Sequence, residues 1–183
     1  MADNEGVEIL SERELGLTLA RLASQILETV EDSRTLMLLG IPTRGVQLSR
    51  VLARELERLT GHAIAQGAID PTFHRDDLER IGTRLPQLTT LPSSVEDRQV
   101  LLVDDVIFTG RTVRASLEAL QNWGRPQRVM LLALADRGHR ELPIQPDFCG
   151  RVVPTRRSET IELRLRDVDG EEGVFLRRLS RPT

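Results

Sequence analysis

The stretch from Val100 to Thr112, VLLVDDVIFTGRT, constrains the fold more than any other part of the chain. Its first four residues are apolar, which predicts a short strand buried on both faces. Asp104 and Asp105 follow where this strand is expected to leave the sheet, and Thr109–Thr112 leads into a helical pattern. Such a loop attracts a phosphate dianion, and paired carboxylates accept hydrogen bonds from vicinal hydroxyls or hold water on a divalent metal. We therefore predict a sugar-phosphate site, with a strand end capped by surface acids as the alternative.

Composition indicates one domain and excludes several chemistries. The chain has 183 residues, 39% of them hydrophobic, which suits a single domain over 1–183. No apolar run approaches the ~20 residues of a membrane helix, and the acidic first residues do not resemble a signal peptide. A lone cysteine, Cys149, excludes an internal disulfide and a cysteine-based zinc site, so we expect a cytoplasmic protein. All 25 basic residues are arginine, which excludes Schiff-base chemistry.

Hydrophobic spacing predicts strands and helices in alternation. Ser11 to Glu14 is a capping box, and leucines at helical spacing follow it, so a helix is expected over about 11–30. Gly61 and Gly124 mark the ends of two further helices. The remaining predictions are strands at 35–39, 63–69, 100–103, 129–135, 161–166 and 174–176, and helices at 48–61 and 113–123.

Residues 70–94 interrupt this alternation. They include Pro71, Pro86 and Pro92, several charges and little periodicity. A segment of this length is rarely an inert connector inside a compact domain, so we interpret it as a flexible arm over a site. A plain surface excursion is the alternative.

Alternating strands and helices with short connections predict a parallel sheet with helices on both faces. Ligands of such sheets bind beyond the carboxyl ends of the strands. Three polar loops, at 40–45, 104–112 and 136–140, are expected to meet there. Their convergence favours a small-molecule site more strongly than any single motif does.

The stretch 100–112 resembles the phosphoribosyl-pyrophosphate motif of the type I phosphoribosyltransferases. Within these, the chain is similar to the PyrR family from about Ile9 to Val168. PyrR proteins are bacterial pyrimidine operon attenuators that also have uracil phosphoribosyltransferase activity. The resemblance is carried by Gly40-Ile41, Thr43-Arg44-Gly45, Arg75-Asp76-Asp77-Leu78, Thr109–Ala115, Gly124-Arg125-Pro126, Asp136–Ile144, Pro154-Thr155 and Ser158-Glu159. His74 and Phe108 depart from it, since tyrosine is common at both positions.

The resemblance implies a fold and a reaction. The fold is a mostly parallel twisted sheet flanked by helices, with the flexible arm at 70–94 and a small hood with C-terminal strands at about 145–183. The reaction converts uracil and phosphoribosyl pyrophosphate to UMP and pyrophosphate, with Mg²⁺ held through substrate and water near Asp104 and Asp105 rather than by direct protein ligands.

Site residues carry over by position. Asp104 and Asp105 contact ribose, the loop to Thr112 cradles the 5′-phosphate, Thr43 and Arg44 grip pyrophosphate, and the base lies beside Arg137 and Ile161. Asp105 is also a possible general base. The implied catalytic residues are Asp104, Asp105 and Arg44, and the implied substrate-binding residues are Thr43, Arg44, Asp104, Asp105, Val106, Ile107, Phe108, Thr109, Gly110, Arg111, Thr112, Arg137 and Ile161. The implied arm residues are Arg75, Asp76, Asp77 and Arg84.

RNA binding is the second function that the resemblance implies, promoted by uridine nucleotides. The candidates are Arg21, His139, Arg140, Arg151 and Arg156. Ala20, Ser24 and Thr29 stand where RNA-binding relatives often have polar or basic residues, which dilutes this surface. Two alternatives stay open: an RNA-binding attenuator with vestigial catalysis, and a phosphoribosyltransferase for another base. A homodimer or homotetramer is expected.

Overall fold

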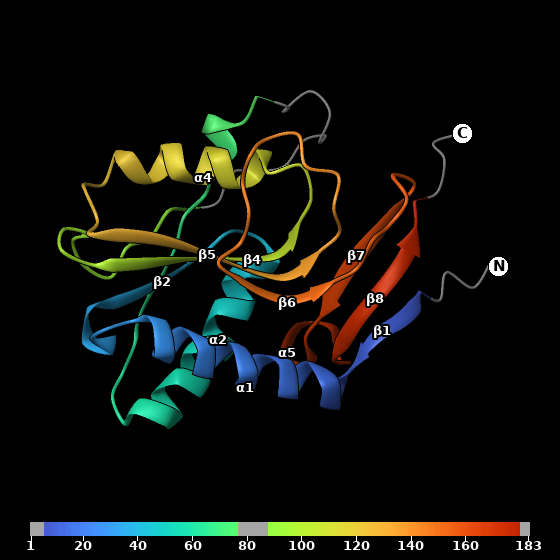
Figure 1. The fold of residues 1–183 in the computed structure, drawn as a ribbon, viewed down its shortest axis with the longest axis horizontal. Coiled ribbons are helices and arrows are strands. Elements are labelled where there is room, and N and C mark those ends of the chain that lie inside the picture. The colour runs from blue at the N-terminus through green and yellow to red at the C-terminus, as the bar shows by residue number, and fades with distance from the viewer. Residues whose placement is uncertain (1–5, 77–87, 180–183) are drawn as a thin grey trace.

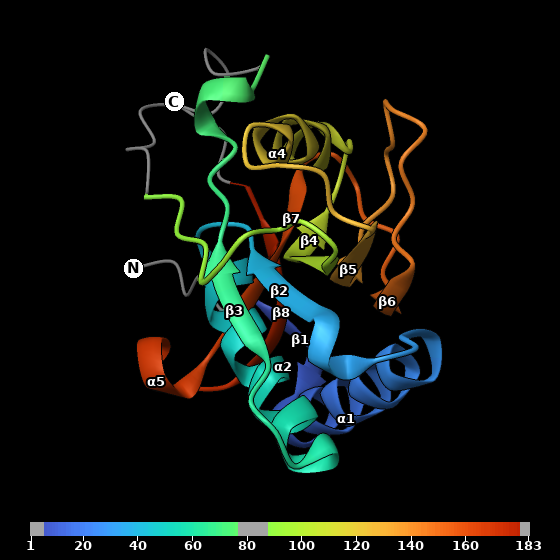
Figure 2. The same ribbon diagram turned by 90° about the vertical axis from the view of Figure 1, so that its left-hand side faces the viewer.

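A computed structural model describes residues 6–76 and 88–179 of the chain. Its centre is a five-stranded, all-parallel sheet with the strand order β3-β2-β4-β5-β6 (Figures 1 and 2). The strands are β2 (Leu36–Gly40), β3 (Ala65–Ala68), β4 (Gln99–Ile107), β5 (Arg128–Asp136) and β6 (Phe148–Val152). The predicted parallel sheet is confirmed. β6 was not predicted, and it places residues 148–152 in the main sheet, outside the expected hood.

Three helices cover the two faces of this sheet. α1 (Glu12–Thr29) and α2 (Arg44–Thr60) lie on one face, and α4 (Arg111–Gln121) lies on the other (Figure 1). Ser11 and Glu14 form the predicted capping box, and Gly61 ends α2 with a φ of 76°. No helix within residues 6–76 and 88–179 is long and apolar enough to cross a membrane.

Helices on both faces of the sheet bury strand β4. Leu101 and Val103 pack into the core with α1 and α2, and Val100 and Leu102 pack into the core with α4. All four side chains are fully buried. Burial of a side chain of this size contributes roughly 1.5–3 kcal/mol, so the uninterrupted apolar run fixes β4 at the centre of the sheet.

The acidic pair lies inside β4, which corrects the prediction that Asp104 and Asp105 follow the strand. β2 stops at Gly40, opposite Val103, whereas β5 stays paired with β4 as far as Ile107. One neighbouring strand therefore ends before the acids and the other continues past them. Sequence patterning did not reveal this because the continuing partner strand is 29 residues away in the chain, as in the pair Asp104 and Ala133.

A smaller antiparallel sheet forms the hood at one end of the main sheet (Figure 1). It has the strand order β1-β8-β7 and consists of β1 (Val7–Ser11), β7 (Glu159–Arg164) and β8 (Gly173–Arg178). The four-residue helix α5 (Arg166–Asp169) connects β7 to β8, and two short 3-10 turns occupy Ser33–Thr35 and Thr72–His74. The hood thus combines the C-terminal strands with a strand from the N-terminal end.

Candidate active site

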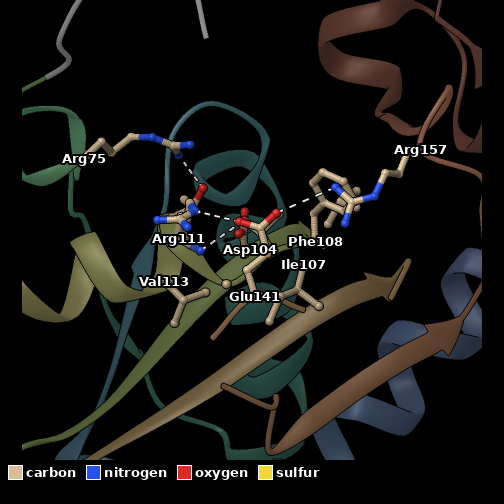
Figure 3. Close-up of a pocket in the computed structure, with 12 residues that line it drawn as sticks. Arg75, Asp104, Ile107, Phe108, Arg111, Val113, Glu141 and Arg157 are labelled. Carbon is tan, nitrogen blue, oxygen red and sulfur yellow. Dashed lines mark hydrogen bonds and ion pairs between the residues drawn. The ribbon is translucent and has the colours of Figure 1, made fainter. Parts of the chain in front are cut away.

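A pocket of about 360 Å³ opens where β4 gives way to α4. Figure 3 shows the side chains that line it, with Arg75, Arg111 and Arg157 at the same opening. The lining residues are Arg75, Asp104, Val106, Ile107, Phe108, Thr109, Gly110, Arg111, Thr112, Val113, Glu141 and Arg157. The structure therefore brings together the predicted loop from Val106 to Thr112, one acid of the pair, and one residue of the predicted arm.

The loop before α4 presents backbone groups to this pocket. Gly110 has a φ of 91°, a left-handed conformation that glycine adopts without steric cost, and α4 begins at the next residue. The N-cap residue, Gly110, has no side chain with which to cap α4, although the Arg111 N–H donates to the Thr109 hydroxyl oxygen at 3.4 Å. First-turn N–H groups at a helix start attract anions, so this loop has the chemistry of a phosphate cradle.

The acidic pair lies beneath the cradle. Asp104 is only 6% exposed, and its Oδ1 accepts a hydrogen bond from the Asp105 N–H at 3.1 Å. Burial raises the pKa of the Asp105 carboxyl, although a hydrogen bond with Asp104 and the positive charge of Arg44 oppose the increase. The oxygens of an ionised carboxyl at this position can accept hydrogen bonds from hydroxyl groups or from metal-bound water.

Thr43 and Arg44 form a separate corner near the pair and are not among the described residues that line the pocket. The preceding loop is held close to β4, because the Ile41 N–H donates to the Val103 carbonyl at 2.9 Å. A Cβ on Gly45 would lie 2.3 Å from that same carbonyl oxygen, so only glycine fits there. The Pro42–Thr43 peptide bond is cis, and α2 starts at Arg44, four residues earlier than the leucine spacing predicts.

Arg137 forms a rigid wall at the predicted base side. It is 6% exposed, and its guanidinium stacks over the Phe108 ring at 4.0 Å. It donates to the Thr155 hydroxyl at 3.1 Å and to the carbonyls of Arg156 and Glu159 at 3.1 and 2.5 Å. Burial lowers the pKa of this guanidinium, and the charge of Glu159 partly offsets that effect. Since every bond goes to fixed groups, the Arg137 plane is held in one orientation.

Ile161 lies in β7, is 6% exposed, and packs in the same apolar core as α1 and α2. Its side chain therefore serves packing, and any contribution to base recognition falls to its backbone.

The comparisons with known proteins decide the family. The chain matches the phosphoribosyl transferase domain over residues 6–156. It is 51% identical over 173 residues to the bifunctional protein PyrR of Thermosynechococcus vestitus, with 94% of each chain covered. It is 52% identical over 170 residues to the bifunctional protein PyrR of Synechocystis sp., covering 93% of this chain and 96% of that one. The chain belongs to the PyrR family of phosphoribosyl transferases.

The fold of this PyrR relative is shared with distant phosphoribosyltransferases. A hypoxanthine phosphoribosyl transferase of Trypanosoma cruzi superposes with a TM-score of 0.74 at 17% identity, covering 97% of this chain and 94% of that one. This likeness establishes the type I phosphoribosyltransferase fold alone. The expected fold class is confirmed.

The described start of the predicted arm, residues 70–76, contacts the pocket. Arg75 donates to the Thr112 hydroxyl, and Asp76 pairs with Arg111 at 2.8 Å. Arg111 also pairs with Glu141 at 2.9 Å, and Arg157 approaches Glu141 at 3.7 Å. Arg75 therefore lies at the first turn of α4, beside the loop that the resemblance assigns to the 5′-phosphate. The other predicted arm residues, Asp77 and Arg84, lie outside the described residues.

The loop at 136–144 is held mainly by its own side chains. Arg140 pairs with Asp136 at 2.6 Å and donates to the carbonyls of Phe108 and Ile144 at 2.9 and 2.8 Å. A ring nitrogen of His139 lies 2.6 Å from the Thr155 carbonyl oxygen, and its ring meets Phe108 edge-on. Both RNA candidates in this loop thus support the wall formed by Phe108.

Two of the remaining RNA candidates lie close together on the surface of the protein, where α1 meets β6. Arg21 of α1 donates to the Gly150 carbonyl at 2.6 Å, and Arg151 of β6 donates to the Ile9 carbonyl at 3.0 Å. Arg21, Arg151 and Arg156 are exposed. Three of the five candidates therefore present charge to solvent.

Sequence reasoning missed Glu141 and Arg157 as pocket residues and Asp169 as the partner of Arg44. Glu141 lies in a segment that carries the family resemblance, but its role depends on folding of that loop against α4. In residues 6–76 and 88–179, no group of three or more His, Cys, Asp or Glu side chains is arranged to hold a metal. Two adjacent carboxylates fit a Mg²⁺ ion bound mainly through substrate oxygens and water.

Proposed function

We propose that this protein is a uracil phosphoribosyltransferase that makes UMP and pyrophosphate from uracil and phosphoribosyl pyrophosphate. The observation that carries the proposal is the pocket in which the 109–112 cradle and Asp104 face one opening lined by three arginines. The membership of the chain in the PyrR family supports the same reaction. The bond that breaks joins ribose C1′ to pyrophosphate, and the bond that forms joins C1′ to a ring nitrogen of uracil. The proton on that nitrogen leaves to water or to the departing pyrophosphate.

The residues divide the substrate among them. The α4 start and Thr109–Thr112 bind the 5′-phosphate, and Asp104 and Asp105 accept hydrogen bonds from the ribose hydroxyls. Thr43 and Arg44 bind the leaving pyrophosphate, for which a forked guanidinium is suited. Positive charge develops on the ribose as pyrophosphate departs, so alignment and stabilisation of the leaving charge dominate the catalysis.

Uracil is assigned to the side formed by Phe108 and Arg137. The stacked pair offers a flat, fixed surface, and the backbone near Ile161 supplies hydrogen-bonding groups for the edge of the base. Asp104 and Asp105 would hold Mg²⁺ through water molecules, and the ion would neutralise phosphate charge when it is bound. A role of Asp105 in holding ribose and metal water accounts for its position without a general base.

A labelled-base assay with phosphoribosyl pyrophosphate and Mg²⁺ tests the reaction. Uracil is the expected substrate, with hypoxanthine, guanine and orotate compared at equal concentration. Conversion of a purine or of orotate in preference to uracil would overturn the choice of base. EDTA is the matched control for the metal, and it is expected to abolish turnover that excess Mg²⁺ restores.

We further propose that a uridine-nucleotide-bound form binds mRNA and regulates pyrimidine genes. The exposed arginines Arg21, Arg151 and Arg156 support this role, because guanidinium groups bind phosphate with an affinity that falls as salt increases. Filter binding of the pyr leader RNA with and without UMP is the test. The Arg21→Ala, Arg151→Ala double variant is expected to reduce the salt slope by about 1.4, with Arg50→Ala on α2 as the control.

The expected assembly, a homodimer or homotetramer in the cytoplasm, completes the proposal. Val7 of β1 and Leu17 of α1 are 68% and 62% exposed, and apolar area of this kind is available for contact between copies. Light scattering across a range of protein concentrations measures the assembly directly, and a monomer at every concentration would contradict it.

A further inference from the structure

Arg44 forms an ion pair with a residue that lies outside the family motif. Its Nη2 donates to Oδ1 of Asp169, the last residue of α5, at 2.6 Å. The two side chains are 26% and 18% exposed, so the pair is largely screened from water. The partners are 125 residues apart in the chain, and the contact brings α5 to the first turn of α2.

The Asp169 carboxylate is itself fixed. Its other oxygen, Oδ2, accepts the Leu165 N–H at 2.9 Å, which anchors the carboxylate across α5. Arg44 therefore binds only one oxygen of the Asp169 carboxylate. A guanidinium has five N–H donors in a fixed plane, so a single bond occupies one of them. The ion pair can set the direction of this plane while other donors of Arg44 stay available for phosphate oxygens.

α5 and α2 touch at only part of their facing surfaces, because a cavity separates the rest. A cavity of about 490 Å³ lies between the two elements, lined by Gln47, Arg50 and Arg54 on one side and by Leu165 to Val168 on the other. The second ion pair across it, Arg54 with Asp167, is longer at 3.8 Å and mostly exposed. Arg44–Asp169 is accordingly the closest charged link between the two elements in the described part of the chain.

The position of α5 in the chain connects the Arg44–Asp169 ion pair to strand β7. α5 begins two residues after β7, the strand that carries Ile161, and Gly170 ends it with a φ of 77°. The base-side strand and the pyrophosphate-side arginine are thus joined through four residues of helix and one ion pair. Displacement of α5 relative to β7 would be transmitted to the Arg44 guanidinium.

We propose that Asp169 is a positioning residue that orients Arg44 for pyrophosphate binding. This inference rests on the proposed function, in which Arg44 binds the pyrophosphate group. Asp169 contacts no substrate in this scheme and acts only through Arg44. Through Asp169, the hood therefore contributes to the affinity for phosphoribosyl pyrophosphate.

The test is a double-mutant cycle of Asp169→Asn and Arg44→Ala. Asparagine keeps an oxygen to accept the Leu165 N–H and removes the charge that holds Arg44. Binding of phosphoribosyl pyrophosphate with Mg²⁺, without base, is measured by calorimetry, and KM and kcat are measured with uracil. We expect Asp169→Asn to weaken binding and raise KM about five- to tenfold, with kcat within about twofold of the parent.

In the Arg44→Ala background, Asp169→Asn should change binding less than twofold, because the arginine that it orients is absent. The same loss in both backgrounds would indicate a merely structural role and would overturn the inference, as would unchanged affinity in the single variant. Asp167→Asn, in the same helical turn, is the matched control and should bind like the parent. Thermal melting of each variant verifies that binding is measured on folded protein.

Failure of the proposed function gives a different result. A parent protein that binds phosphoribosyl pyrophosphate but does not convert uracil would overturn the choice of base, and the binding cycle would still decide the role of Asp169. A parent protein that does not bind phosphoribosyl pyrophosphate would overturn both.

Discussion

Arg111 and Glu141 meet at the mouth of the pocket, where Arg111 Nε donates to Glu141 Oε2 at 2.9 Å (Figure 3). The contact joins the first residue of α4 to the loop at 136–144, and Arg111 also pairs with Asp76 on its other side. A hydrogen bond with Glu141 and the negative charges of Asp76 and Glu141 raise the pKa of Arg111. A carboxylate thus lies beside the place proposed for the 5′-phosphate dianion.

Glu141→Gln is expected to strengthen the binding of phosphoribosyl pyrophosphate. The change removes a negative charge beside the proposed phosphate position and leaves Arg111 with one acidic partner. The pair is about one-third exposed, so the effect is modest, about two- to fivefold in KM, with little change in stability. Steady-state kinetics measure the change in KM. Glu118→Gln, on the same helix as Arg111, is the control. Weaker binding would show that Glu141 orients Arg111.

The double substitution Asp104→Asn, Asp105→Asn is expected to lower turnover by at least ~10²-fold. It removes the charged acceptors for ribose and for metal-bound water while nearly preserving shape. Initial rates with saturating uracil and Mg²⁺ measure the loss. Parent-like kcat/KM would exclude the assigned role of the pair.

Asp105→Asn alone is expected to stabilise the protein at neutral pH. Burial raises the pKa of Asp105, so the folded state holds its proton more tightly than the unfolded chain does. Its contribution is fully present below the ordinary value of about 3.8 and is lost as pH rises through the folded pKa. The variant should therefore melt above the parent at pH 7–8, with a difference that narrows as pH falls. A difference independent of pH would contradict this account.

Arg140→Ala is expected to lower the free energy of unfolding by about 3 kcal/mol, because it leaves the Asp136 carboxylate buried without its partner. Both side chains are only 14% exposed, and Arg140 also binds the Phe108 carbonyl. Urea denaturation measures the change, and the exposed Arg156→Ala is the control. We expect Arg140→Ala to spare kcat/KM more than Arg44→Ala does when both are assayed well below their melting temperatures.

Cys149 is expected to be alkylated slowly. Burial and the negative charge of Asp136 raise the pKa of its thiol, so little reactive thiolate exists near neutral pH. Iodoacetamide labelling at pH 7.5 should be at least several-fold slower than in urea-unfolded protein, and it should accelerate as pH rises. Labelling at equal rates in the folded and unfolded protein would disagree with this assignment.

The helices and strands that could be predicted from the sequence are those specified by residues close together in the chain. The capping box at Ser11, the leucine spacing of α2 and the buried run of β4 each act within a few residues, and the structure confirms all three. The elements that were missed depend on distant partners. β1 and β6 lack strong alternation and exist because β8 and β5 pair with them, and α5 is too short for any periodicity.

The same division applies to the site. The loop at 106–112 and Asp104 line the pocket as the motif predicts, because strand, loop and helix are continuous in sequence. The contacts of Glu141 with Arg111 and of Asp169 with Arg44 join residues 30 and 125 positions apart. Neither has a sequence spacing that could reveal it, since one depends on how the loop at 136–144 folds against the start of α4 and the other on how α5 packs against the start of α2.

The pairing of β1 with β8 has a consequence for synthesis of the chain. β1 lies at the edge of the smaller sheet, and its strand partner there is β8, with Val7 opposite Leu176. During translation, residues of β1 emerge from the ribosome well before residues 173–178, so β1 stays without this strand partner until those residues have been made. The strands of the main sheet, β2 to β6, are synthesised before β8, so that sheet can assemble cotranslationally, whereas the hood completes its folding only after β8 has emerged.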